Sequence, residues 1–230
     1  MSNKPLSNIG IPMPSDFPSE PYDEVSRRVG SFSTHTPATL SHFAGAWNAV
    51  AYRYSACADY DVAFTDSIRC YGDAPPPQER NLQERCLFGF FVSGLAALES
   101  IYYGLFAVGA LLNPAHFPLS TDNEMRAVNP RSTADHYFRV FPSEGITNVL
   151  LQLEQSQEFK DWREIRNILA HRTAPGRIIH ASTTGIDSPA LWRTGIPLDT
   201  NTTTSRRTWL AAKLTLLITE ANAFTQSHFT

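Results

Sequence analysis

Cysteine and charge are both scarce in this chain. Of its 230 residues, three are cysteines, and 18% are charged. Cys57, Cys70 and Cys86 form no Cys-x-x-Cys pair and have no histidines at a matching spacing. The sequence therefore predicts neither a disulfide framework nor a zinc site, and we expect reduced thiols, no bound metal and no cofactor.

The motifs of several common hydrolases are also missing. The sequence has no Gly-rich phosphate loop, no pair of catalytic carboxylates at a helical spacing and no Ser-His-Asp order. These absences argue against a nucleotide hydrolase and against an ordinary esterase. The net charge of -3 and the pI of about 6.1 give no overall attraction for nucleic acid, so any such binding must be local.

The amino terminus lacks the apolar stretch of an ordinary secretory signal. It begins Met-Ser-Asn-Lys-Pro and continues into further prolines. Together with the expectation of reduced thiols, this pattern leads us to expect a cytoplasmic protein.

What the chain does have is apolar content with helical periodicity. Apolar residues make up 42% of it, which is enough for a sizeable core. Apolar positions recur at helical spacing in five segments, with proline and glycine at several of their ends. The segments are 39–71, 78–112, 143–157, 158–172 and 206–226. We predict an all-α fold, an up-and-down bundle of four to five main helices, in a single domain over residues 39–230.

Three other stretches show no such period. Residues 1–38 are rich in Pro, Ser and Gly, and we expect a tail or an arm that wraps the domain. Residues 113–142 are punctuated by Pro and Asn, which predicts a long loop or insertion between helices. Residues 173–204 combine Gly, Pro, Ser and Thr with brief extended pieces, which indicates a short hairpin or an irregular excursion.

Residues 86–112 are almost continuously apolar and are long enough to cross a bilayer once. Glu99 is the only formal charge in this run, and an ionised carboxylate is costly in lipid. No dense basic cluster marks one flank of the run. We therefore favour a central bundle helix, with membrane association through this run as the alternative.

Segment 158–172 is the only one that indicates a chemistry. Its apolar residues follow the stripe of a helix with one face in a core. They are Phe159, Trp162, Ile165, Ile168 and Leu169. On the remaining faces, Arg163, Asn167 and His171 stack at spacings of four, and Arg166 lies about one step round the helix from Asn167. A cation, an amide and a titratable imidazole are therefore displayed together.

The order Arg166-Asn167, three residues, His171, followed by Arg172 and a helix-breaking Thr-Ala-Pro-Gly, resembles the signature of the HEPN superfamily of helical-bundle proteins. The resemblance implies a metal-independent endoribonuclease, often a toxin or host-defence effector, with a composite site at a homodimer interface. It also implies RNA as the substrate and an antitoxin or nucleotidyltransferase-like protein as a partner. Members with this motif can also serve as non-catalytic modules for dimerisation or for protein or nucleotide binding.

These residue types suit RNA cleavage. An imidazole, with an ordinary pKa of about 6.5, can take a proton from a ribose 2′-hydroxyl or give one to the leaving oxygen. Arg166 can bind the scissile phosphate with paired donors, with Arg163 and Arg172 as further substrate contacts. Asn167 would orient His171 or the phosphate. A chain with one such histidine has only one imidazole to serve as both general acid and general base. A dimer would supply two, which favours a dimer.

A structural explanation of the same residues stays open. A histidine and an arginine near a helix C-terminus are favoured by the helix dipole and by capping of the last carbonyls, as expected for His171 and Arg172. The other arginines of the helix can pair in solvent with carboxylates such as Asp161 and Glu164.

Glu99 is the second residue of interest. A carboxylate in an apolar helix is usually paired, hydrogen-bonded or directed into a cavity or an interface. One hypothesis is that Glu99 supports the site by pairing with Arg163 or Arg166. The alternative is a carboxyl group that reaches water at a groove.

Overall fold

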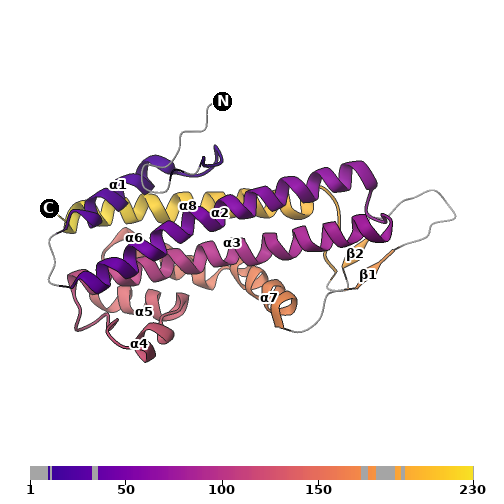
Figure 1. Ribbon diagram of the computed structural model, residues 1–230. Helices are drawn as coiled ribbons and strands as arrows, with labels where there is room; N and C mark the ends of the chain where they lie inside the picture. Colours follow the sequence, from indigo (N-terminus) through magenta and orange to yellow (C-terminus); the bar gives the residue numbers. More distant parts are fainter. Residues whose placement is uncertain are drawn as a thin grey trace. The chain divides into compact units, whose positions relative to one another are not determined.

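The computed structural model describes residues 10, 12–32, 36–171, 176–179, 190–192 and 195–229, and of His171 it describes the backbone alone. Within these residues the chain is an all-α helical bundle with one two-stranded sheet, which confirms the predicted fold class (Figure 1). The elements are α1 (Ser19–Gly30), α2 (Pro37–Tyr71), α3 (Pro77–Leu112), α4 (Asp122–Ala127), α5 (Pro130–Val140), α6 (Gly145–Gln155), α7 (Gln157–His171), β1 (Arg177–Ile178), β2 (Leu191–Trp192) and α8 (Asn201–His228). The five predicted helices correspond to α2, α3, α6, α7 and α8.

The chain divides into two compact units. The first comprises Met1–Tyr54, Ala96–Lys160 and Ala211–Thr230, and the second comprises Ser55–Leu95 and Asp161–Leu210. Each of the helices α2, α3, α7 and α8 therefore contributes one stretch of residues to each unit. The sequence led us to expect one domain, without this internal division.

In the first unit, α1 is joined to α2 by a pair of buried aromatic residues. The Tyr22 hydroxyl donates to the Trp47 carbonyl at 2.8 Å, and the Trp47 indole donates to the Tyr22 carbonyl at 3.1 Å. The two rings stack with centroids 5.3 Å apart. The prediction of an irregular tail is therefore wrong for Ser19–Gly30. The helix forms there because Pro18 and Pro21 occupy its cap and its first turn, where proline is tolerated.

Two short helices, α4 and α5, occupy the segment in which we predicted a loop. The Thr121 hydroxyl accepts from the Glu124 amide at 3.3 Å, and the Glu124 carboxylate accepts from the Thr121 amide at 2.9 Å. Asn129 caps α5 in the same reciprocal way, and Pro130 suits the first helical position. The prediction of irregular structure over 113–142 is therefore wrong for α4 and α5, because these capping boxes start helices among the prolines.

Buried tyrosines join α5 and α6 to α3 within the first unit. The Tyr137 hydroxyl of α5 donates to the Leu105 carbonyl at 2.8 Å. The Tyr102 hydroxyl of α3 donates to the Leu150 carbonyl of α6 at 2.9 Å. Each of these bonds satisfies a buried phenol and fixes one helix against another.

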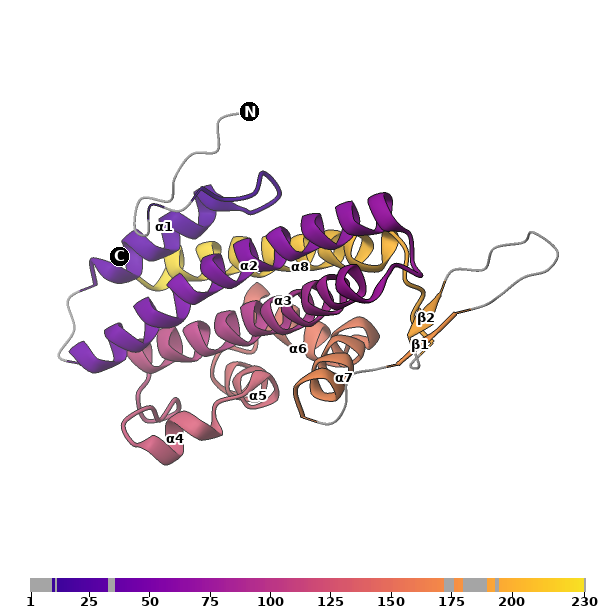
Figure 2. The ribbon, with the colours of Figure 1, turned by 45° about the vertical axis from the view of Figure 1, so that its right-hand side comes forward.

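In the second unit, β1 and β2 pair in antiparallel register beside the turn that joins α2 to α3 (Figure 2). Arg177 of β1 donates to Glu84 at 2.6 Å, to Gln83 at 2.7 Å and to the Asp73 carbonyl at 2.9 Å. The Trp192 indole of β2 donates to the other Glu84 oxygen at 3.0 Å. This pairing confirms the hairpin alternative for the paired residues of 173–204, and much of the rest of that segment lies outside the described residues.

Helix α3 is long and apolar enough to cross a membrane by length and composition. In its most apolar 18-residue stretch, 72% is buried inside the protein. Such burial is typical of the central helix of a bundle, so it favours that prediction over a membrane span.

Candidate functional site

The candidate site lies on α7, whose apolar face is buried as the sequence predicts. Phe159, Trp162 and Ile165 are 0%, 2% and 7% exposed. Ile168 and Leu169, toward the end of the helix, are half-buried. The burial of one face fixes which faces of α7 remain for polar side chains.

Trp162 is the main anchor of α7 in the second unit. Its ring lies 5.1 Å from the Phe90 ring and 5.2 Å from the Phe91 ring, both on α3. It also stacks on Trp209 of α8 at 6.5 Å. The ring lies so close to Gly94 that a Cβ atom at that position would be 2.4 Å from Trp162 Cζ3. The absence of a side chain at Gly94 therefore makes room for the indole.

The motif residues, which we define as Arg166, Asn167 and His171, all belong to α7. Arg166 and Asn167 are half-buried, as is Arg163 one turn earlier. His171 is the last residue of the helix, and Arg172 lies outside the described residues. The structure therefore brings Arg163, Arg166 and Asn167 onto one helix, with the backbone of His171 at its C-terminal end.

Arg206 on α8 is a cation near α7 that the sequence did not bring to attention. Its guanidinium lies 5.7 Å from the centre of the Phe91 ring and donates to the Thr202 carbonyl at 2.7 Å. Burial lowers the pKa of Arg206, while the negative charges of Asp161 and Asp199 act in the opposite direction. Arg206 thus contacts a ring and a carbonyl, and two carboxylates act on its charge. In the sequence it is only one of two adjacent arginines in a predicted helix.

Arg177 adds little to the positive surface charge of residues 160–177. Its side chain is 3% exposed and forms an ion pair with Glu84, so its positive charge is neutralised inside the second unit. The basic residues of that window that stay partly or fully exposed are Lys160, Arg163 and Arg166. The local positive charge on the described surface is therefore weaker than the sequence indicates.

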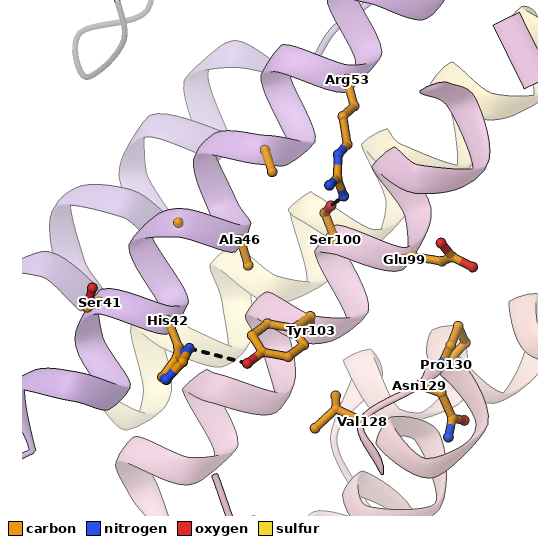
Figure 3. A pocket seen from close by; sticks show the side chains of 12 residues that line it. Ser41, His42, Ala46, Arg53, Glu99, Ser100, Tyr103, Val128, Asn129 and Pro130 are labelled. Atoms are coloured by element: carbon orange, nitrogen blue, oxygen red, sulfur yellow. Dashed lines mark hydrogen bonds between the residues drawn. The ribbon is translucent and has the colours of Figure 1, made fainter. Parts of the chain in front are cut away.

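A second candidate site, which sequence reasoning missed, is a groove of about 610 Å³ within the first unit (Figure 3). We call it the α2–α3 groove. Its lining residues include His42, Gly45, Arg53, Glu99, Tyr103 and Asn129. Glu99 is half-buried and extends toward the side on which Asn129 and Pro130 lie. Glu99 therefore lines a groove of the first unit.

The supporting role of Glu99 toward the motif stays a prediction. Glu99 belongs to the first unit, whereas Arg163 and Arg166 belong to the second. Its presence in a groove agrees with the alternative of a carboxyl group that reaches water.

The groove holds an imidazole–phenol pair. Tyr103 on α3 and His42 on α2 form a hydrogen bond of 3.2 Å between the phenolic oxygen and Nδ1. Burial raises the pKa of the Tyr103 phenol, which therefore stays protonated through neutral pH. The pair thus offers a neutral hydroxyl and a titratable ring at one end of the groove.

Among the described residues, no three His, Cys, Asp or Glu side chains gather as metal ligands would. Cys57 and Cys86 are buried thiols and Cys70 is an exposed one, and none of the three forms a disulfide.

Comparison of the chain with protein-family models, with curated proteins and with solved structures finds no match.

Proposed function

We propose that this protein is a HEPN-like, metal-independent endoribonuclease with its site on α7. The observation that carries the proposal is that Arg166, Asn167 and His171 follow one another on a single helix whose opposite face is buried. In this proposal RNA is the substrate, and Arg163 and Arg172 contact its backbone. A role as a toxin or in host defence, with an antitoxin or nucleotidyltransferase-like partner, follows from the same resemblance.

The proposed chemistry assigns one task to each motif residue. His171 exchanges a proton with the ribose 2′-hydroxyl or with the leaving oxygen, as an imidazole can at neutral pH. Arg166 binds the phosphate with two parallel donors and offsets the charge that develops during attack. Asn167 orients the imidazole or the phosphate through its amide.

The anchoring of α7 supports this assignment. A catalytic group must be held close to its productive geometry by residues whose own positions are locked by packing. Trp162 and Ile165 lie one turn or less before the motif and are nearly fully buried. The start of the motif is therefore built on a rigid part of the helix.

The competing function is a non-catalytic module that dimerises or binds a protein or a nucleotide through the same face of α7. The half-burial of Arg163, Arg166 and Asn167 is compatible with it, because interfaces also use arginine and amide side chains. The two functions differ in one property, which is the cleavage of RNA.

The deciding experiment is cleavage of total RNA by purified protein in buffer with EDTA, which suppresses contaminating metal-dependent nucleases. Wild type is compared with His171→Ala and Arg166→Ala. Matched controls are Arg69→Ala and His116→Ala, which remove the same side-chain types from exposed positions. Circular dichroism checks that all five proteins are folded.

Cleavage by wild type and both controls, with loss in both motif variants, supports the nuclease. Cleavage that survives in the motif variants would assign the activity to another site. No cleavage by any of the proteins would favour the non-catalytic module.

The support predicted for Glu99 has its own test. If Glu99 holds an arginine of α7, Glu99→Gln should lower both RNA cleavage and thermal stability. A variant unchanged in both would rule out the pairing.

A further inference from the structure

The α2–α3 groove is built on one face of α2. His42, Gly45, Ala49 and Arg53 recur at spacings of three or four, so they line the same side of the helix. Gly45 and Ala49 leave the middle of this face almost without side chains. A Cβ atom added at Gly45 would meet no other atom within 4 Å, so the space above it is open. The groove thus has a floor of small residues between two polar ends.

Arg53 is held at one end of the groove in a fixed orientation. Its Nη1 donates to the Ala96 carbonyl at 3.1 Å and to the Ser100 hydroxyl (Figure 3). The Ser100 hydroxyl in turn donates to the Ala96 carbonyl at 2.7 Å. Both protons of Nη1 are therefore used on the backbone and side chain of α3.

The remaining edge of the Arg53 guanidinium is available to a ligand. Among the described residues, Nε and Nη2 of Arg53 have no hydrogen-bond partner, and no carboxylate lies within ion-pair distance of this side chain. These two nitrogens form the fork that matches two oxygens of a carboxylate or a phosphate. A half-buried arginine whose third nitrogen is already tied loses little freedom when it binds such a group.

The other walls of the groove carry groups suited to hydroxyls. Glu99 presents carboxylate oxygens that can accept from a hydroxyl donor. The Tyr103 and His42 pair stands at the end opposite Arg53. An anion that also bears hydroxyls would gain hydrogen bonds there that a bare inorganic anion cannot make.

We propose that the α2–α3 groove binds a small polyhydroxylated oxyanion, with its phosphate or carboxylate on the Nε and Nη2 edge of Arg53 and its hydroxyls on Glu99 and the Tyr103–His42 pair. The volume of about 610 Å³ lies within the range typical of pockets for small organic ligands. Every groove residue named in this proposal belongs to the first unit, whereas the motif residues belong to the second. Glu99 is the one residue that both proposals use, so the variants that test the groove are placed at Arg53 and Gly45, which have no part in the nuclease proposal.

The test is isothermal titration of the full chain, in a buffer free of phosphate, with four probes. Ribose 5-phosphate and gluconate carry both features, ribose lacks the anion, and inorganic phosphate lacks the hydroxyls. We expect ribose 5-phosphate, gluconate or both to bind, and to bind more tightly than ribose or inorganic phosphate. Which of the two binds more tightly distinguishes a phosphate from a carboxylate ligand.

Two variants locate the binding, each with a matched control. Arg53→Gln should weaken it about ten- to a hundredfold, as expected for loss of a bidentate charged contact, while Arg27→Gln on the exposed surface of α1 should not. Gly45→Leu, whose Cβ atom meets no neighbour, should fill the groove and abolish binding, while Ala44→Leu, at the adjacent exposed position of α2, should not.

Because Gly45 is exposed and has open space at the Cβ position, Gly45→Leu keeps the proposal testable even if Arg53→Gln fails to fold. Binding of neither ribose 5-phosphate nor gluconate to wild type would overturn the proposal. Equal binding of ribose, or unchanged binding to Gly45→Leu, would also overturn it.

Discussion

Gly94 of α3 offers a sharp test of how α7 is held, because its neighbourhood leaves no room for a methyl group. A Cβ atom there would lie 2.4 Å from Trp162 Cζ3, 2.5 Å from Trp162 Cη2 and 3.1 Å from the sulfur of Cys57. The indole cannot easily retreat, since it is already packed against the rings of Phe90 and Phe91. Gly94→Ala should therefore displace Trp162 and loosen the attachment of α7.

The magnitude follows from two opposing terms. Overpacking a tight core by one methyl group costs about 1–3 kcal/mol. Replacing glycine with alanine inside a helix returns about 0.5–1 kcal/mol. The net loss for Gly94→Ala is then at most about 2.5 kcal/mol, which lowers the melting temperature of a chain of this length by up to roughly 10 °C.

Gly45→Ala is the matched control, because it places the same methyl group in the interior of α2 with no atom within 4 Å. Only the favourable helix term acts there, so it should raise the free energy of unfolding by about 0.5–1 kcal/mol. Urea unfolding followed by circular dichroism measures both variants, and tryptophan fluorescence reports on Trp162. If Gly94→Ala proves as stable as Gly45→Ala, the close packing of Trp162 on α3 is wrong.

Three further predictions follow from hydrogen bonds in the two units. Tyr22→Phe removes the buried hydroxyl that donates to Trp47 and should cost about 1–2 kcal/mol in urea unfolding, whereas an unchanged midpoint would show that this bond contributes nothing. Arg177→Gln leaves the partly exposed Glu84 without its cation and should cost about 2–3 kcal/mol, part of which the double variant with Glu84→Gln should restore. Two backbone amides hold the pKa of Glu124 below its ordinary value, so its stabilising contribution is complete above the pKa of the unfolded chain and is lost as pH falls through the folded pKa. Glu124→Gln should therefore flatten the loss of stability in acid, and an NMR titration that finds an ordinary pKa would contradict this.

The long helices could be predicted because their signals are local. The segment 39–71 has helical periodicity throughout and ends at Gly72, which adopts a positive φ of 71° that glycine favours at a helix end. The second long helix follows the prolines after Gly72 and ends at Leu112, one residue before Asn113. In such segments the apolar period, the start signals and the stop signals agree, so the local sequence and the tertiary packing favour the same helix.

The sequence predicts a loop where α4 and α5 lie, because prolines in that segment indicate irregular structure while capping residues indicate helix starts. Thr121 and Glu124 stand in the Thr-x-x-Glu spacing of a capping box, and that signal could have located α4. Pro130 follows the capping residue Asn129 and opens α5, which is a position that proline favours. Helices this short, 6 and 11 residues, contain too few turns to show a long apolar stripe, so capping is the main local signal for them.

The α2–α3 groove could not be predicted in the same way. It depends on the space that Gly45 and Ala49 leave beside side chains from α3 and from the start of α5, and these are distant in sequence. Nothing near Arg53 in the sequence shows that Ser100 and the Ala96 carbonyl take up one of its nitrogens. The α7 motif, in contrast, lies within a single helix, so its residues could be grouped by spacing alone.

Subunit mixing tests the dimer that the nuclease proposal requires. A two-fold interface places the same surface of both chains together, so a site at that interface contains two copies of His171, one as the acid and one as the base. When wild type is allowed to exchange subunits with increasing His171→Ala, activity should then fall with the square of the wild-type fraction, because every mixed dimer lacks one imidazole. Mixing with Arg69→Ala should leave activity unchanged. A linear fall would show that each chain works alone. Sedimentation that finds only monomer at the assay concentration would also contradict the shared site, because the single His171 of one chain would then have to act as both acid and base.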